Sequence, residues 1–206
     1  MCAFDGPFDR FLYMDADTIL MNRIEPFFEQ LDRADWVVYD FQYKDLSHVY
    51  DVSSPRLTEV FSQERIDSEI FCSGLYATKK RIFDRAKCEE VLAQLRSGEA
   101  EILYIWASDQ TVLNYMAMKS NLKLYNFALQ LPKEQVTGCC VTSSHFEEKE
   151  HVLYDRGRQL TYLHYIGISS SAFTHLCAGE NLGLPSRDIF LHYRYLHEPE
   201  QQPDFS

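Results

Sequence analysis

The chain has 206 residues, enough for one domain with a sizeable core. Hydrophobic residues make up 46% and aromatic residues 14% of it, which excludes a disordered or low-complexity protein. The formal net charge of −11 argues against a nucleic-acid partner, which requires a basic face, but it leaves phosphate-bearing substrates open because a bound cation reverses the local charge.

No apolar run reaches 18 residues, and no hydrophobic leader follows Met1. Neither a transmembrane segment nor a signal peptide is therefore predicted. The six cysteines form no Cys-x-x-Cys pair, so we expect free thiols rather than a zinc site. These features predict a cytoplasmic protein.

Residues 11–20 carry the strongest chemical signal. The apolar run 11–14 has the length of a buried strand, and it ends in two carboxylates, Asp15 and Asp17. Carboxylates at the end of a core strand are costly unless they are compensated, and a divalent cation such as Mg²⁺ or Mn²⁺ does this well. The alternative is that both aspartates lie in a loop and cap the next helix.

Strands and helices are predicted to alternate along the rest of the chain, which indicates an α/β fold. We expect strands at 36–39, 70–77, 122–125 and 161–167, and helices at 26–32, shortly after Pro55, at 79–97, at 109–119 and after Ser186. The stretches 41–54 and 126–150 are expected to be irregular. The prolines near the end predict a flexible tail at 199–206, which leaves one domain over 1–198.

Three other positions have both a structural and a functional interpretation. Gly74 interrupts a predicted strand, which marks either the close approach of a ligand or a bulge. Asp109 falls in the first turn of a helix, where the helix dipole favours a carboxylate. His164 ends a strand, where it is either a ligand or a satisfied core histidine.

Four motifs, taken in order, resemble the GT-A glycosyltransferases, especially the glycogenin-like retaining ones. The first is the Asp-x-Asp strand and following helix at 11–29, and the second is Phe71-Cys72-Ser73-Gly74 for the family's Phe-Asn-Ser-Gly. The third is Ser108-Asp109-Gln110-Thr111-Val112-Leu113-Asn114 for its Asp-Gln-x-x-Leu-Asn helix start, and the fourth is His164-Tyr165-Ile166-Gly167 for its His-Phe-x-Gly. The resemblance covers about residues 5–170 and implies a GT-A-like α/β fold with a mixed, mainly parallel sheet flanked by helices.

The resemblance implies a metal-dependent enzyme that moves a sugar from a nucleotide sugar, expected to be a UDP-sugar, to an acceptor that the sequence does not identify. The cation would stabilise the departing diphosphate. By resemblance, Asp15, Asp17 and His164 would bind Mn²⁺ or Mg²⁺, Asp109 and Gln110 would act at the sugar as catalytic residues, and Ala16, Ser73, Gly74 and Gly167 would contact the substrate.

The chain departs from the family pattern in three places. Cys72 replaces the asparagine, and no lysine follows Gly167 in the family's usual place. Only fourteen residues precede Asp15, whereas the family builds its nucleotide pocket from elements before the Asp-x-Asp. The fold is therefore expected to be N-terminally truncated, with an exposed sheet edge through which a homo-oligomer could form.

Two alternatives remain open. The chain could be an inactive GT-A scaffold that serves as a binding partner. The Asp-x-Asp-x-Thr pattern also fits the haloacid-dehalogenase-like phosphatases, with Asp15 as nucleophile and Asp17 as acid or base. That family needs a later lysine, for which Lys79 and Lys80 are candidates, and an acidic cluster ending another strand, which the sequence does not offer.

Overall fold

The computed structural model describes residues 2–106 and 109–205. Contacts divide the chain into two compact units. Unit 1 consists of Met1–Asp15 and Ile24–Val136, and unit 2 of Ala16–Arg23 and Thr137–Ser206. The single domain over 1–198 and the flexible tail stay predictions.

Unit 1 is built on a four-stranded sheet in the order β1 (Arg10–Met14), β4 (Leu75–Lys79), β3 (Trp36–Val38) and β5 (Leu124–Asn126). Strand β4 is antiparallel to both of its neighbours, and β3 is parallel to β5. Strands β1, β3 and β5 therefore share one direction. The mixed α/β class is confirmed, although within this sheet of described residues only the β3–β5 pairing is parallel.

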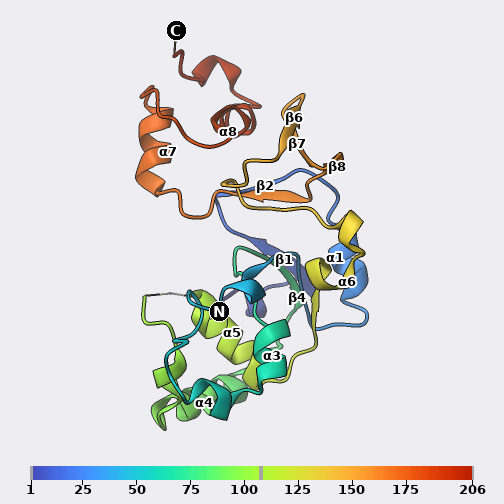
Figure 1. Ribbon diagram of the computed structural model, residues 1–206, viewed down its shortest axis with the longest axis vertical. Helices are drawn as coiled ribbons and strands as arrows, with labels where there is room; N and C mark the ends of the chain where they lie inside the picture. The colour runs from blue at the N-terminus through green and yellow to red at the C-terminus, as the bar shows by residue number, and fades with distance from the viewer. Residues whose placement is uncertain (1, 107–108, 206) are drawn as a thin grey trace. The chain divides into compact units, whose positions relative to one another are not determined.

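Short helices surround this sheet (Figure 1). Helix α1 contacts β1 and β3, and it lies beside α6 with the rings of Phe27 and Phe127 5.1 Å apart. In chain order the helices of unit 1 are η1 (Cys2–Asp5), α1 (Glu25–Gln30), η2 (Gln42–Lys44), α2 (Leu57–Val60), α3 (Gln63–Ser68), α4 (Arg85–Arg96), η3 (Glu99–Ile102), α5 (Asp109–Lys119), α6 (Phe127–Gln130) and η4 (Lys133–Gln135).

Aromatic side chains form the centre of the unit 1 core. Trp36 is fully buried and stacks on Tyr76 of the neighbouring strand, with ring centroids 4.3 Å apart. Phe71 packs on the same indole at 5.1 Å. Helix α5 contributes Tyr115 and Met116 to this cluster, and seven of its eleven residues are buried. The burial of α5 fixes the position of its first turn, which carries Asp109 and Gln110.

Unit 2 contains two small antiparallel sheets. Strand β2 (Thr18–Leu20) pairs with β9 (Tyr162–His164), and β7 (Val152–Asp155) pairs with β6 (Glu147–Lys149) and β8 (Arg158–Gln159). The helices of this unit are α7 (Ser170–Cys177), α8 (Arg187–Arg194) and η5 (Pro199–Gln201). Its core unites the sheets with α8 through Leu153, Leu163 and Ile189.

Several element boundaries differ from the sequence expectation. The strand expected at 70–77 begins only at Leu75, because the preceding backbone is hydrogen-bonded to a side chain of α5. The helix expected at 79–97 begins at Arg85, where Asp84 caps it by accepting the Lys87 N–H at 2.8 Å. Strand β2, the β6–β8 sheet and α7 were not predicted.

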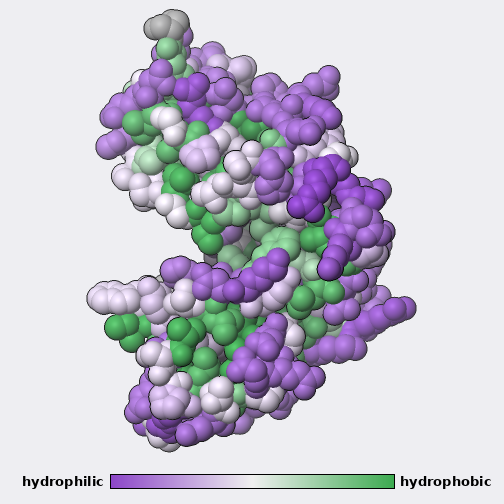
Figure 2. Space-filling model, in the orientation of Figure 1, coloured by the Kyte–Doolittle hydropathy of each residue, from purple (hydrophilic) through white to green (hydrophobic). Residues whose placement is uncertain are grey.

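The surface mixes hydrophilic and hydrophobic residues on the visible face (Figure 2). Among the residues that the structure describes, the most exposed large apolar side chains are Trp106 and Ile105, at 81% and 80%. In the described part of the chain, no helix is both long enough and apolar enough to cross a membrane. Strand β1 forms one edge of the sheet of unit 1, and the proposed homo-oligomer through that edge stays a prediction.

Candidate metal centre and its surroundings

Asp15 directly follows β1 and is fixed at two points. Its backbone N–H donates to the carbonyl oxygen of Gly74 at 2.8 Å. Its carboxylate oxygen Oδ1 accepts a hydrogen bond from the hydroxyl of Tyr13 at 2.9 Å. Because β1 is registered against β4 from Arg10 to Met14, the position of Asp15 follows from the sheet pairing.

Asp17 and His164 are brought together by the pairing of β2 with β9. Thr18 lies opposite His164, and the Tyr165 N–H donates to the Asp17 carbonyl at 2.9 Å. The His164 Nε2 lies 3.4 Å from the Asp17 Oδ1. The imidazole is 8% exposed and the Asp17 side chain 32%, so this pair has one buried and one accessible partner.

The backbone of His164 is also held on its other side. Its N–H donates to the Cys139 carbonyl at 2.7 Å, and its carbonyl accepts the Val141 N–H at 3.0 Å. The histidine therefore sits on a strand that is hydrogen-bonded along both edges. Such a residue has little freedom to move, which suits a metal ligand as well as a core histidine.

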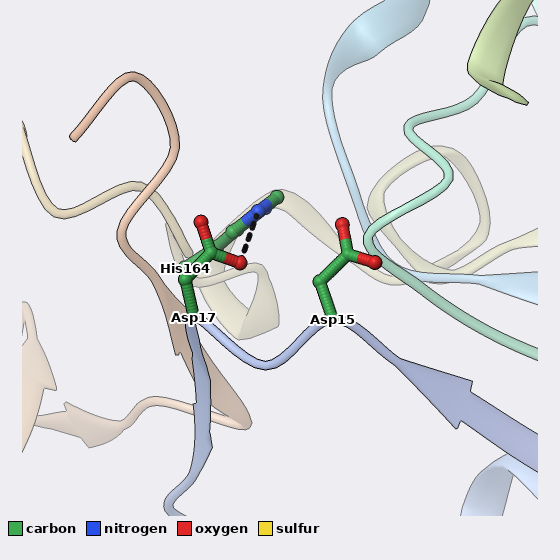
Figure 3. A group of neighbouring side chains, drawn as sticks. All are labelled: Asp15, Asp17 and His164. Carbon is green, nitrogen blue, oxygen red and sulfur yellow. Dashed lines mark ion pairs between the residues drawn. The ribbon is translucent and has the colours of Figure 1, made fainter. Parts of the chain in front are cut away.

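Together, the three expected ligands form a compact group. Asp15, Asp17 and His164 each offer one ligand atom, and these atoms all lie within 4.8 Å of one another (Figure 3). Two hard carboxylate oxygens and one imidazole nitrogen fit Mn²⁺ or Mg²⁺, and three protein ligands leave coordination positions for a substrate. The alternative that the aspartates cap the next helix is wrong, because α1 begins at Glu25 and its N-cap is Ile24.

A chain of hydrogen bonds links the other expected site residues of unit 1. Gly74 holds Asp15, and the N–H of Ser73 donates to the side-chain oxygen Oε1 of Gln110 at 3.2 Å. The fully buried Asn114 then ties α5 to this segment, since its side chain bonds both the N–H and the carbonyl of Phe71, at 2.9 and 2.8 Å. Asn114 belongs to the motif at 109–114, for which no separate role of this residue was expected.

Asp109 is exposed in the first turn of α5, as expected. It lies close enough to Tyr76 to act on the phenol electrostatically. The pKa of Tyr76 is raised mainly by burial, and then by the charges of Tyr13, Asp109 and Asp15. Tyr76 therefore stays protonated, and Asp109 and Asp15 both affect the same phenol of β4.

The two remaining substrate-binding candidates are surface positions. Ala16 is exposed between the two aspartates. Gly167 is exposed in the turn that follows β9, where the Ile168 N–H donates to the Tyr165 carbonyl. The φ of Gly167 is +82°, a conformation that favours glycine, and a Cβ there would meet no atom within 4 Å. Their role toward a substrate stays a prediction.

Asp40 is a candidate functional residue that the sequence reasoning missed. It lies two residues after the end of β3, and Asp15 directly follows β1; since β1 and β3 share a direction, both residues lie at the same end of the strands. Asp40 is 3% exposed, and its Oδ2 has no hydrogen-bond partner in the described structure.

Burial raises the pKa of Asp40 from 3.8 to about 7. The backbone N–H groups of Gln42 and Cys72 favour the charged form without offsetting the burial. Asp40 can therefore exchange a proton near neutral pH beside Cys72. The signal that could have revealed it is the acidic residue directly after the second apolar strand.

Comparisons with family models, with curated proteins and with solved structures gave no match to this chain.

Proposed function

We propose that the chain is a metal-dependent glycosyltransferase domain that uses a nucleotide-sugar donor, with a UDP-sugar as the expected donor, and that its fold is GT-A-like. The observation that carries the proposal is the convergence of Asp15 and Asp17 with His164, which is distant from them in sequence, on a group of ligand atoms within 4.8 Å. The mixed sheet with three strands in one direction is compatible with this fold.

Asp15, Asp17 and His164 would hold Mn²⁺ or Mg²⁺. When bound, the cation would supply positive charge to the diphosphate as it leaves the sugar. The two carboxylates by themselves would repel a diphosphate, so donor binding should require the metal. This dependence distinguishes the proposed site from a simple His–Asp ion pair.

Ser73, Gly74, Asp109 and Gln110 are proposed to face the sugar. The Gln110 Oε1 already accepts the Ser73 N–H, so its amide nitrogen is the group that would donate to a sugar hydroxyl. The exposed carboxylate of Asp109 is able to accept from such a hydroxyl or to stabilise positive charge at the anomeric carbon. Asn114 fixes the segment on which Ser73 lies.

The phosphatase alternative has less support from unit 1. Lys79 lies opposite Arg10 at the start of β1, whereas Asp15 follows its end, a separation of roughly 16 Å along the strand. Lys79 is paired with Asp35 at 3.2 Å and Lys80 with Asp9 at 3.0 Å. Neither lysine is therefore placed to assist a nucleophile at Asp15.

The test is calorimetric titration of the chain with UDP, in Mn²⁺ and in chelator. The proposal expects the unchanged protein to bind UDP in the presence of Mn²⁺ but not in chelator. It expects the Asp17→Asn variant not to bind UDP even in the presence of Mn²⁺. Asp188→Asn is the matched control, because Asp188 is an exposed carboxylate of the same unit that pairs with Arg187. Equal UDP binding in chelator and in Mn²⁺ would contradict the proposal. Absence of UDP binding under both conditions would favour the inactive scaffold.

A further inference from the structure

Tyr13 packs against the core of unit 1 and contacts Asp15, one of the proposed metal ligands. Its hydroxyl donates to the Asp15 Oδ1 at 2.9 Å. Strand packing alone does not require this hydroxyl, since Phe11, two residues earlier on the same face of β1, packs against the same cluster without one. The phenol oxygen thus provides a contact that a phenylalanine would lack.

The ring of Tyr13 is itself held in place. It lies opposite Tyr76 in the β1–β4 register and stacks on it, with ring centroids 5.0 Å apart and an interplanar angle of 19°. Both rings pack against the aromatic core of unit 1. A hydroxyl on a ring fixed in this way is a rigid donor, and rigid outer partners orient metal ligands.

The main chain of Asp15 is fixed independently by its bond to Gly74. With the backbone and one carboxylate oxygen both held, the plane of the carboxylate is restricted. A cation that binds both oxygens of Asp15 would have to compete with the Tyr13 hydroxyl for Oδ1. A cation that binds a single carboxylate oxygen would not.

From this geometry we infer that Tyr13 is a positioning residue that orients Asp15 for single-oxygen coordination and so selects Mn²⁺ or Mg²⁺ over Ca²⁺. Ca²⁺ is larger and readily takes bidentate carboxylates, whereas Mg²⁺ demands near-octahedral geometry. The inference rests on the proposed metal site and extends it to the choice of cation.

The test compares Tyr13→Phe with the unchanged protein by measuring the Kd of Mn²⁺ through electron paramagnetic resonance and the Kd of Ca²⁺ by calorimetry. Loss of an outer hydrogen bond to a ligand typically weakens metal binding by about 10-fold or more. We expect the Kd of Mn²⁺ to rise about 10-fold and that of Ca²⁺ to rise less, so that the preference for Mn²⁺ falls.

The matched control is Tyr125→Phe, which removes a tyrosine hydroxyl from β5 at the opposite edge of the same sheet. Thermal unfolding of all variants in chelator checks that they fold. An unchanged Kd of Mn²⁺ in Tyr13→Phe, or equal weakening for both cations, would overturn the positioning role. If the unchanged protein binds Mn²⁺ no better than Asp17→Asn does, the proposed metal site itself is wrong, which is a distinguishable outcome.

Discussion

Asp40 provides the sharpest prediction about stability. The carboxyl is buried beside β3, and its pKa is raised from 3.8 to about 7. The folded state therefore binds the Asp40 proton more tightly than the unfolded state does. The free energy of unfolding contributed by this group is highest below pH 3.8 and falls as the pH rises to about 7.

The size of the effect follows from the two pKa values. A pKa difference of one corresponds to about 1.4 kcal/mol. The rise of the Asp40 pKa from 3.8 to about 7 therefore lowers the free energy of unfolding by up to about 4 kcal/mol between pH 3.8 and pH 8. Asp40→Asn removes the charge and with it this loss. The variant should be nearly as stable as the unchanged protein at pH 4 and more stable at pH 8 by up to about 4 kcal/mol.

The assay is urea unfolding of both proteins at intervals from pH 4 to pH 8. Other titrating groups act equally on both, so the difference between the two free energies isolates Asp40. Asp45→Asn serves as the control, because hydrogen bonds from Ser47 lower the pKa of Asp45 and its contribution is lost as the pH falls. A difference for Asp40→Asn that stays flat with pH would refute the reasoning.

Three further predictions concern the site and its supports. Asp17→Asn should raise the Kd of Mn²⁺ at least about tenfold in paramagnetic resonance, while an unchanged Kd would remove Asp17 from the site. Asn114→Ala leaves the Phe71 N–H and carbonyl without their side-chain partner, so urea unfolding should show a free energy of unfolding lower by about 2–4 kcal/mol. A decrease below about 0.5 kcal/mol would mean that the backbone around Phe71 does not depend on these bonds. Gly98→Ala strains a φ of +115° and brings a Cβ to 2.5 Å from the Arg56 guanidinium, so it should cost about 1–2 kcal/mol in thermal unfolding, and a neutral result would contradict the strained conformation.

An apolar run and a helical apolar spacing each predicted an element correctly. The strand predicted at 11–14 is β1, and the helix predicted at 109–119 is α5 with the same bounds. Strand β6 could not be found this way, because its three residues are charged and exposed and carry no apolar alternation. The late start of β4 was also not predicted, because it depends on the hydrogen bond between the Asn114 side chain of α5 and the Phe71 backbone.

The candidate metal ligands could be named from the sequence because each is part of a short motif. Tyr13 was not identified as a site residue, because an aromatic residue in a strand is expected for packing alone. Its role follows from the hydrogen bond that its hydroxyl donates to Asp15. Asp40 was missed for a related reason: its raised pKa comes from burial, which local sequence does not reveal. The roles of Tyr13 and Asp40 depend on a side-chain hydrogen bond and on burial, and both required the three-dimensional structure.

The most direct test of the metal-dependent transferase proposal is a thermal unfolding titration with Mn²⁺, with UDP, and with both. A ligand that binds only the folded state raises the unfolding temperature by mass action. The proposed site predicts that Mn²⁺ and UDP together give a shift larger than the sum of their separate shifts, and that Asp15→Asn abolishes the excess. Shifts that merely add, or that persist in the variant, would contradict a metal–diphosphate site at Asp15, Asp17 and His164.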